Sequence, residues 1–226
     1  MPAHLEYIFF NVLVLAGPLL FSFDRKLRFV KRWRSAVIAI LSVMPAFIVW
    51  DWLVTGRHWW FNPVYTAGTL IGPLPLGEWL FFLTVPFASL FVWEVLRHYH
   101  PLGAEPQPIY HPLWLTLFAL PVVWALQSGK EYTALVLFAF TATAFLDLTM
   151  GGKVLARRNT VAYAILLAGL MLLFNGYLTA RPVVLYEARY QVDVRICSIP
   201  IEDFLYGYTL LLGCTSVYEK SRGAYE

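Results

Sequence analysis

Carboxylic acids stand at the head of two similar segments of this 226-residue chain. Glu78 lies in the stretch Leu74-Pro-Leu-Gly-Glu-Trp-Leu-Phe-Phe82, and Glu202 and Asp203 lie in Ile199-Pro-Ile-Glu-Asp-Phe-Leu-Tyr-Gly207. A carboxylate at the head of a membrane segment costs free energy and usually serves a function. Because the chain makes this choice twice, we interpret Glu78, Glu202 and Asp203 as candidate catalytic residues.

These acids are placed where they can exchange protons with a substrate. Proline suits the first position of a helix, so Pro75 and Pro200 are expected to begin helices that carry the acids in their first turn. The helix dipole favours the charged form there by about 0.3–1 kcal/mol. Burial in a dry site favours the neutral form more strongly, and two adjacent acids resist joint ionisation if their carboxyl groups converge. A neutral acid in an apolar site can donate a proton.

Aromatic residues follow the acids at helical spacing. Phe81 and Phe82 come three and four residues after Glu78, and Tyr206 comes three residues after Asp203, so each set shares one helix face. Aromatic faces stabilise cations, and the pattern therefore fits a reaction that passes through a carbocation. The alternative for each aromatic residue is an ordinary place at a lipid-facing or interfacial position.

The composition indicates an integral membrane protein. The chain is 59% hydrophobic and 14% charged, with a mean hydropathy of +0.62, whereas soluble domains carry about 25% charged residues. The net charge of +3 gives no reason to expect a nucleic-acid partner. Two cysteines provide neither a disulfide framework nor a metal motif. The first 24 residues hold no Lys or Arg, which argues against a secretory signal peptide.

Seven apolar runs predict the elements that position the acids. Isolated helices satisfy their own backbone groups in lipid, so each run is expected to form a transmembrane helix in an all-α integral membrane fold. The runs lie at residues 5–23, 35–54, 76–95, 112–128, 132–148, 160–180 and 200–218.

Loop charge predicts the orientation of these helices. The loop 24–34 and the connections on the same side carry 12 Lys and Arg residues, and the opposite side carries 5. The positive-inside rule then places the N-terminus outside and the C-terminus in the cytoplasm. We expect a multi-pass protein of the cell (inner) membrane, with lipid around it and with its oligomeric state left open.

The acid motifs belong to a longer internal repeat. We therefore expect two parallel three-helix repeats, residues 1–100 and 131–226, joined by residues 101–130, which hold a Pro- and Gly-rich linker and an unpaired fourth helix. Parallel repeats with a site at their interface are a known membrane architecture. Matches occur at a spacing of 125 for Glu6-Tyr7 with Glu131-Tyr132, Tyr65 with Tyr190 and Glu94 with Glu219, and at a spacing of 124 for Asp51 with Asn175.

The sequence lacks the motifs by which several cofactors are usually bound. The chain has no Gly-x-Gly-x-x-Gly for a flavin or nicotinamide and no pair of Asp-rich motifs for magnesium diphosphate. Its histidines show no metal-ligand spacing, and the last apolar run, 200–218, has no lysine for a Schiff base. We therefore expect neither a metal nor an organic cofactor.

The motifs resemble the membrane-integral carotenoid (lycopene) cyclase family in its fused form, over nearly the whole chain. The first half resembles it in Trp50-Asp51 followed by Thr55, in Phe61-Asn62-Pro63-x-Tyr65-x-x-Gly68 and in Leu74-Pro-Leu-x-Glu-x-Leu-Phe-Phe82. The second half resembles it in Ile199-Pro-Ile-Glu-Asp-Phe-Leu-Tyr-Gly-Tyr208. The resemblance implies a lipophilic polyene substrate, lycopene or a related carotenoid, whose ψ end groups close to ionone rings, with the β ring expected, without net redox change.

The resemblance also implies roles for individual residues. We favour the Glu202–Asp203 pair as the proton donor, because coupled acids readily keep one proton, and Glu78 as the base or cation stabiliser. Polar support is expected from Asp51, Asn175 and Asn62. Aromatic residues of the motifs are expected to bind substrate, namely Tyr65, Trp79, Phe81, Phe82, Tyr190, Phe204 and Tyr206.

One departure from the family pattern leaves alternatives open. The first motif usually reads Pro-aliphatic-Glu-Glu, and Gly77 replaces the first of these acids here. Gly77 could mark a variant with the same reaction, a different ring type or cyclisation of one end only. The other functions considered are hydration or another modification of C40 or C50 carotenoid end groups, and carotenoid binding or transport without catalysis.

Overall fold

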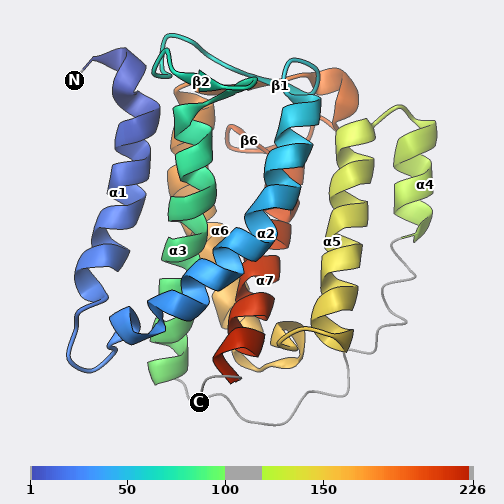
Figure 1. The fold of residues 1–226 in the computed structure, drawn as a ribbon. Helices are drawn as coiled ribbons and strands as arrows, with labels where there is room; N and C mark the ends of the chain where they lie inside the picture. The colour runs from blue at the N-terminus through green and yellow to red at the C-terminus, as the bar shows by residue number, and fades with distance from the viewer. Residues whose placement is uncertain (1, 100–118, 224–226) are drawn as a thin grey trace.

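The computed structural model describes residues 2–99 and 119–223, and seven α-helices dominate this part of the chain (Figure 1). Each predicted apolar run overlaps one of them, although residues 112–118 of the fourth run lie outside the described residues. The helices are α1 (Glu6–Phe21), α2 (Trp33–Val54), α3 (Leu76–Tyr99), α4 (Ala119–Gln127), α5 (Glu131–Thr149), α6 (Asn159–Ala180) and α7 (Ile201–Gly223).

Five of these helices are long and apolar enough to cross a membrane, namely α1, α2, α3, α5 and α6. These five helices are candidate membrane spans, as the apolar runs predict. Helix α7 is 23 residues long but more polar. It contacts α2, α3, α5 and α6, so its buried polar side chains face other helices rather than lipid.

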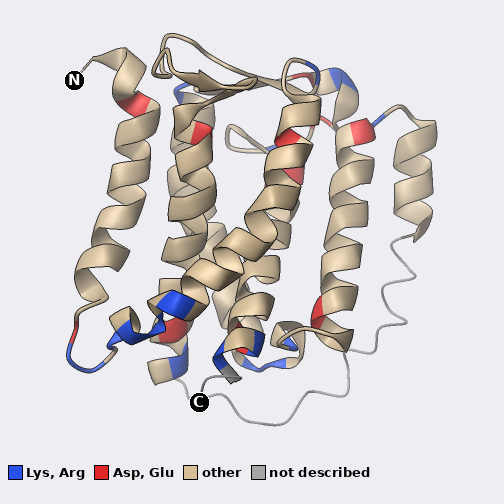
Figure 2. Cartoon of the chain, in the orientation of Figure 1, with Lys and Arg blue, Asp and Glu red and all other residues tan. Residues whose placement is uncertain are grey.

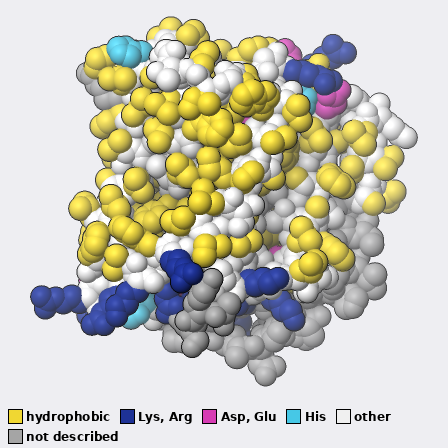
Figure 3. Space-filling view, viewed as in Figure 1, with side chains coloured by type: hydrophobic (Ala, Val, Ile, Leu, Met, Phe, Trp, Pro, Cys, Tyr) yellow, Lys and Arg dark blue, Asp and Glu magenta, His cyan; other side chains and the backbone are white. Residues whose placement is uncertain are grey.

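The surface agrees with a bundle that lies in lipid. Large apolar side chains such as Leu20, Leu53 and Ile165 are exposed, and hydrophobic side chains cover most of the face drawn in Figure 3. Lys and Arg gather at the end of the bundle that carries the C-terminus (Figure 2). The acids of the two motifs lie toward the opposite end, beside the N-terminus.

Six short strands in the loops at that end were not predicted, and the fold is mostly rather than entirely helical. They form three two-stranded antiparallel sheets, each strand being only two or three residues long. Strands this short are hard to recognise from alternating hydrophobicity. They are β1 (Trp59–Phe61) with β4 (Val184–Tyr186), β2 (Leu70–Ile71) with β3 (Leu74–Pro75), and β5 (Arg195–Ile196) with β6 (Ile199–Pro200).

The sheet of β1 and β4 joins the two halves of the chain around an approximate two-fold axis. Trp60 pairs with Leu185, its own counterpart at the repeat spacing of 125. The hairpins β2–β3 and β5–β6 are separated by the same spacing. Each turns through a residue with positive φ, Gly72 in the first and Cys197 in the second. The internal repeat therefore extends from the sequence into the backbone.

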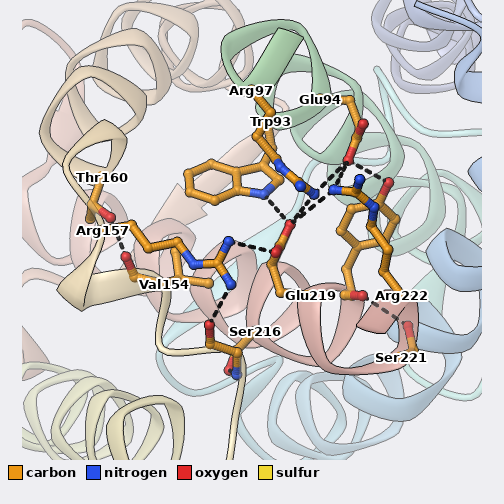
Figure 4. A network of polar contacts seen from close by, with 12 residues as sticks. Trp93, Glu94, Arg97, Val154, Arg157, Thr160, Ser216, Glu219, Ser221 and Arg222 are labelled. Carbon is orange, nitrogen blue, oxygen red and sulfur yellow. Dashed lines mark hydrogen bonds and ion pairs between the residues drawn. The ribbon is translucent and has the colours of Figure 1, made fainter. Parts of the chain in front are cut away.

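A buried ionic network joins the halves at the basic end of the bundle (Figure 4). Glu219 of α7 accepts hydrogen bonds from Trp93 and Arg97 of α3, both at 2.8 Å, and pairs with Arg157 at 2.6 Å. In the opposite direction, Tyr218 of α7 donates to Glu94 of α3 at 2.8 Å. Each half thus supplies an aromatic donor to the glutamate of the other.

This network predicts a large loss of stability for Glu219→Gln. The change removes a buried carboxylate and takes from Arg157 the counter-charge that it has in Glu219, and breaking a buried pair in this way costs about 3–5 kcal/mol. Thermal unfolding in detergent should show a clearly lower midpoint. Asp193→Asn is the matched control, because Asp193 forms an exposed ion pair with Arg195 at 3.9 Å, and such pairs contribute about 0–1 kcal/mol. Equal midpoints for the two variants would contradict the assignment.

Candidate active site

The site is a long cavity of about 420 Å³ inside the bundle, within the range of about 300–1,000 Å³ typical of small-molecule sites. On α1 its lining runs from Tyr7 to Phe21, a rise of about 21 Å at 1.5 Å per residue. Three carboxyl groups line it, those of Asp51, Glu78 and Asp203. All three lie near the ends of their helices that are opposite the basic end of the bundle, and the walls beyond them are mainly apolar.

Glu78 and Asp51 form one hydrogen-bonded unit across α2 and α3. Their carboxyl groups lie close enough to each other to share a hydrogen bond when one of them is protonated. The Tyr7 hydroxyl donates to Glu78, and the Tyr206 hydroxyl donates to Asp51 Oδ1 at 2.7 Å. A hydrogen bond between two carboxyl groups needs a proton, since ionised carboxylates only accept. This pair is therefore built to hold one proton.

Asp203 has a different environment, with three donors converging on it. The hydroxyls of Tyr132 and Tyr186 donate at 2.8 and 2.5 Å, and the side-chain amide of Asn175 donates at 3.1 Å. Hydrogen bonds to the charged form of a carboxyl group favour that form. These three donors stabilise the carboxylate form of Asp203 against its burial.

Tyr186 comes from strand β4, outside the helices. Burial, together with the charge of the nearby Asp203, raises the pKa of Tyr186 well above its usual range. The phenol therefore keeps its proton and remains a donor to Asp203. The approximate symmetry extends to the helices, because the Tyr7 hydroxyl donates a hydrogen bond to Glu78 just as the Tyr132 hydroxyl donates one to Asp203.

Glu202 does not share the environment of Asp203. Its Oε1 accepts from Thr133 Oγ1 at 2.6 Å and from the backbone N–H of Val192 at 2.7 Å. Its Oε2 is buried with no hydrogen-bond partner among the described residues. Consecutive residues of a helix point about 100° apart, so the two carboxyl groups do not converge. Glu202 holds the loop before α7 and is not part of the cavity lining.

The position of Gly77 explains the departure from the family motif. A Cβ atom at Gly77 would lie 2.5 Å from Cδ1 of Tyr7, so the ring of Tyr7 occupies that space. Gly77 is the repeat counterpart of Glu202, and Ile8 is the counterpart of Thr133, the donor to Glu202. The acid and its partner are therefore absent together from the first half. The loss removes a loop contact and leaves the cavity acids in place.

Two of the predicted substrate-binding aromatics, Phe81 and Tyr206, line the cavity. Further aromatics that line it near the acids were not predicted as binding residues, among them Tyr7, Trp59, Phe61, Tyr132 and Tyr186. The ring of Trp59 lies 5.1 Å from that of Tyr132 and 6.2 Å from that of Tyr206. The repeat match of Tyr7 with Tyr132 was a signal for these two residues. Trp59 and Tyr186 reach the site through long-range strand pairing, which the sequence does not reveal.

The other predicted residues lie outside the cavity lining. Tyr65 stacks under Arg181 and Tyr190 packs against His58. Trp79 donates to the carbonyl of Ile71, and the Asn62 side chain accepts from the Val64 N–H in a turn. Phe82 packs against Phe47, and Phe204 is half-buried. Of the predicted supporting residues, Asp51 and Asn175 do line the cavity.

The described residues contain no group of three His, Cys, Asp or Glu side chains placed to hold a metal ion. The site consists instead of acids, phenols and aromatic walls. Such an arrangement can donate a proton, stabilise a cation and accept a proton.

The chain matches the model of a known protein family. The family model described as lycopene cyclase matches residues 4–96 and 130–221, which together cover most of the chain. The match falls in two segments that correspond to the two halves of the repeat. No significant match is found among curated proteins or among solved structures.

Proposed function

The chain belongs to the lycopene cyclase family, a family of enzymes that act in carotenoid biosynthesis, and we propose that it closes the ψ end groups of lycopene to ionone rings inside this cavity. The observation that carries the proposal is the position of Asp51, Glu78 and Asp203 around one end of a long, otherwise apolar cavity. An apolar channel suits a polyene, and the acids meet only its end group. The reaction moves protons and electron pairs within one molecule and needs no oxidant or reductant.

In the first step the Asp51–Glu78 pair is the proton donor. The shared proton passes to the terminal double bond, whose π electrons form the new C–H bond and leave a tertiary cation. This assignment reverses the one made from sequence, which took Glu202 and Asp203 as the coupled pair. The principle is unchanged, since coupled acids keep one proton, but the contact joins Asp51 to Glu78.

The second step closes the ring. The neighbouring double bond attacks the cation, which forms the ring C–C bond and moves the positive charge to a ring carbon. Trp59, Phe61 and Phe81 line the cavity, and aromatic rings can stabilise a cation that lies over their faces. Tyr206 donates its hydroxyl to Asp51 and presents its ring to the same space.

In the third step Asp203 acts as the base. The carboxylate removes a proton adjacent to the cationic carbon, and the C–H electrons form the ring double bond. The choice between two such protons separates a β ring from an ε ring, and the β ring remains our prediction. Proton return from Asp203 to the Asp51–Glu78 pair restores the starting state.

Substrate access is proposed from the lipid, between α1 and α6. Leu13 and Phe21 of α1 line the cavity and are also exposed on the outside of the bundle. At the outer end α1 is tied to α6 by Arg181, which pairs with Glu6 at 2.5 Å. A polyene would enter below this contact and place its leading end group at the acids.

Reconstitution tests the reaction. Purified protein in lipid should convert lycopene to a cyclised product without added flavin or nicotinamide, as measured by pigment chromatography. Strict dependence on a reduced flavin would contradict the redox-neutral mechanism. Unchanged lycopene with folded protein present would favour the carotenoid-binding alternative, in which the acids could be replaced by amides at little cost.

The orientation is proposed from the 12-to-5 distribution of Lys and Arg, with α4 and α7 also crossing the membrane. Single cysteines introduced at Lys31 and Arg157 should be protected from an impermeant thiol reagent in intact cells, whereas cysteines at Arg57 and Arg189 should react. The parent should lack Cys197, which is exposed on the outer side. Reaction at position 31 from outside would overturn the orientation.

A further inference from the structure

The two halves differ in bulk at one pair of equivalent positions. At the repeat spacing of 125, Gly207 of α7 is the counterpart of Phe82 of α3. Phe82 is fully buried, and its ring lies 6.3 Å from that of Phe47 on α2. Gly207 instead lines the cavity. The first half therefore places an aromatic ring where the second half has no side chain of its own on the helix.

The neighbouring helix repeats this difference. Met171 of α6 corresponds to Phe47 of α2 at the spacing of 124 that also relates Asn175 to Asp51. A Cβ atom on Gly207 would lie 2.5 Å from Cε of Met171 and 3.2 Å from its Sδ. Two packed rings in one half are thus replaced by a glycine and a flexible thioether in the other, and both replacements line the cavity.

Gly207 lies close to the proposed base, and only the flexible end of Met171 occupies the place of its missing side chain. Gly207 follows Asp203 by four residues and so occupies the same face of α7, one turn further into the membrane. A ring that forms between the acids must occupy this turn, because the cyclised end group is more compact and broader than the linear one. The absence of a side chain at Gly207 provides the needed width.

We propose that Gly207 and Met171 form the chamber for the reacting end group, and that the described part of the chain contains one such chamber. This inference rests on the proposed function. Each binding event then presents a single end of the polyene to the acids. A bicyclic product requires release of the monocyclic one and its return in the reversed direction.

A series of substitutions tests the chamber in reconstituted protein. Gly207→Phe should lower turnover by about 10²-fold or more, the scale of loss from misplacing a reacting group. Gly207→Ala should give a smaller loss, because its methyl group displaces Met171 toward the substrate. Adding Met171→Ala to Gly207→Ala should restore most of the turnover, which a general defect in folding would not allow.

Gly169→Phe is the matched control. Gly169 also lies in a membrane helix, but it is exposed and no atom lies within 4 Å of an added Cβ, so turnover should be retained. Near wild-type turnover of Gly207→Phe, or failure of Met171→Ala to restore the alanine variant, would overturn the chamber. If wild-type protein itself leaves lycopene unchanged, the proposed function fails instead.

The time course of the wild-type enzyme tests the number of chambers. With lycopene in excess, the first product extracted should be monocyclic, and any bicyclic product should follow it. Bicyclic product that appears at low conversion without free monocyclic product would overturn the single chamber.

Discussion

Replacing Asp203 with asparagine should lower the turnover of lycopene by about 10²-fold or more, the lower range for loss of general acid–base catalysis. Asparagine keeps the size of the side chain, and its single amide oxygen can still accept from one of the two phenols, Tyr132 or Tyr186, but it cannot take the ring proton. Initial rates of the reconstituted protein, followed by pigment chromatography, give the measurement. The variant should still bind lycopene, because the apolar walls of the cavity are unchanged.

The adjacent acid provides the control for this experiment. Glu202→Gln keeps the Oε1 acceptor for Thr133 and Val192 and changes nothing in the cavity lining, so most of the turnover should remain. Its amide nitrogen would replace the buried Oε2, and an unsatisfied buried group costs about 1–3 kcal/mol of stability. A loss of turnover in Glu202→Gln equal to that in Asp203→Asn would return the proton donor to the pair favoured from sequence.

Glu78→Gln and Asp51→Asn should each lower turnover by about 10²-fold, the scale expected when a general acid is removed. If the two carboxyl groups hold one proton between them, removing either removes the donor. The double variant should therefore be about as slow as each single variant, because residues that act as a unit are strongly non-additive. Initial rates of all three variants complete a double-mutant cycle.

Multiplied losses in the double variant would show that Asp51 and Glu78 act independently, against the shared proton. Asp193→Asn serves as the neutral control, since Asp193 is an exposed loop residue. Glu94 is less suitable, although the sequence places it at the far end of α3 from Glu78. Its carboxylate takes part in the buried network with Tyr218 and Arg97, so its replacement should alter stability.

The sequence by itself determined the class of protein, the helices and the repeat. Apolar runs define membrane helices locally, because each helix satisfies its own hydrogen bonds. Each of the seven runs overlaps a helix, and the spacing of 125 recurs in the pairing of Trp60 with Leu185. The motifs also identified the family and placed Glu78 and Asp203 at the helix starts. These features depend on residue type and spacing along the chain.

Only the tertiary structure decided which acids act together. Glu202 and Asp203 are neighbours in sequence, but they point in different directions from the helix. Glu202 contacts the loop before α7, and Asp203 lines the cavity. Asp51 and Glu78 are distant in sequence, and the packing of α2 against α3 joins them. Trp59 and Tyr186 reach the site because β1 pairs with β4. Contacts of this kind depend on how helices rotate and pack against one another, which the periodicity of a single segment does not specify.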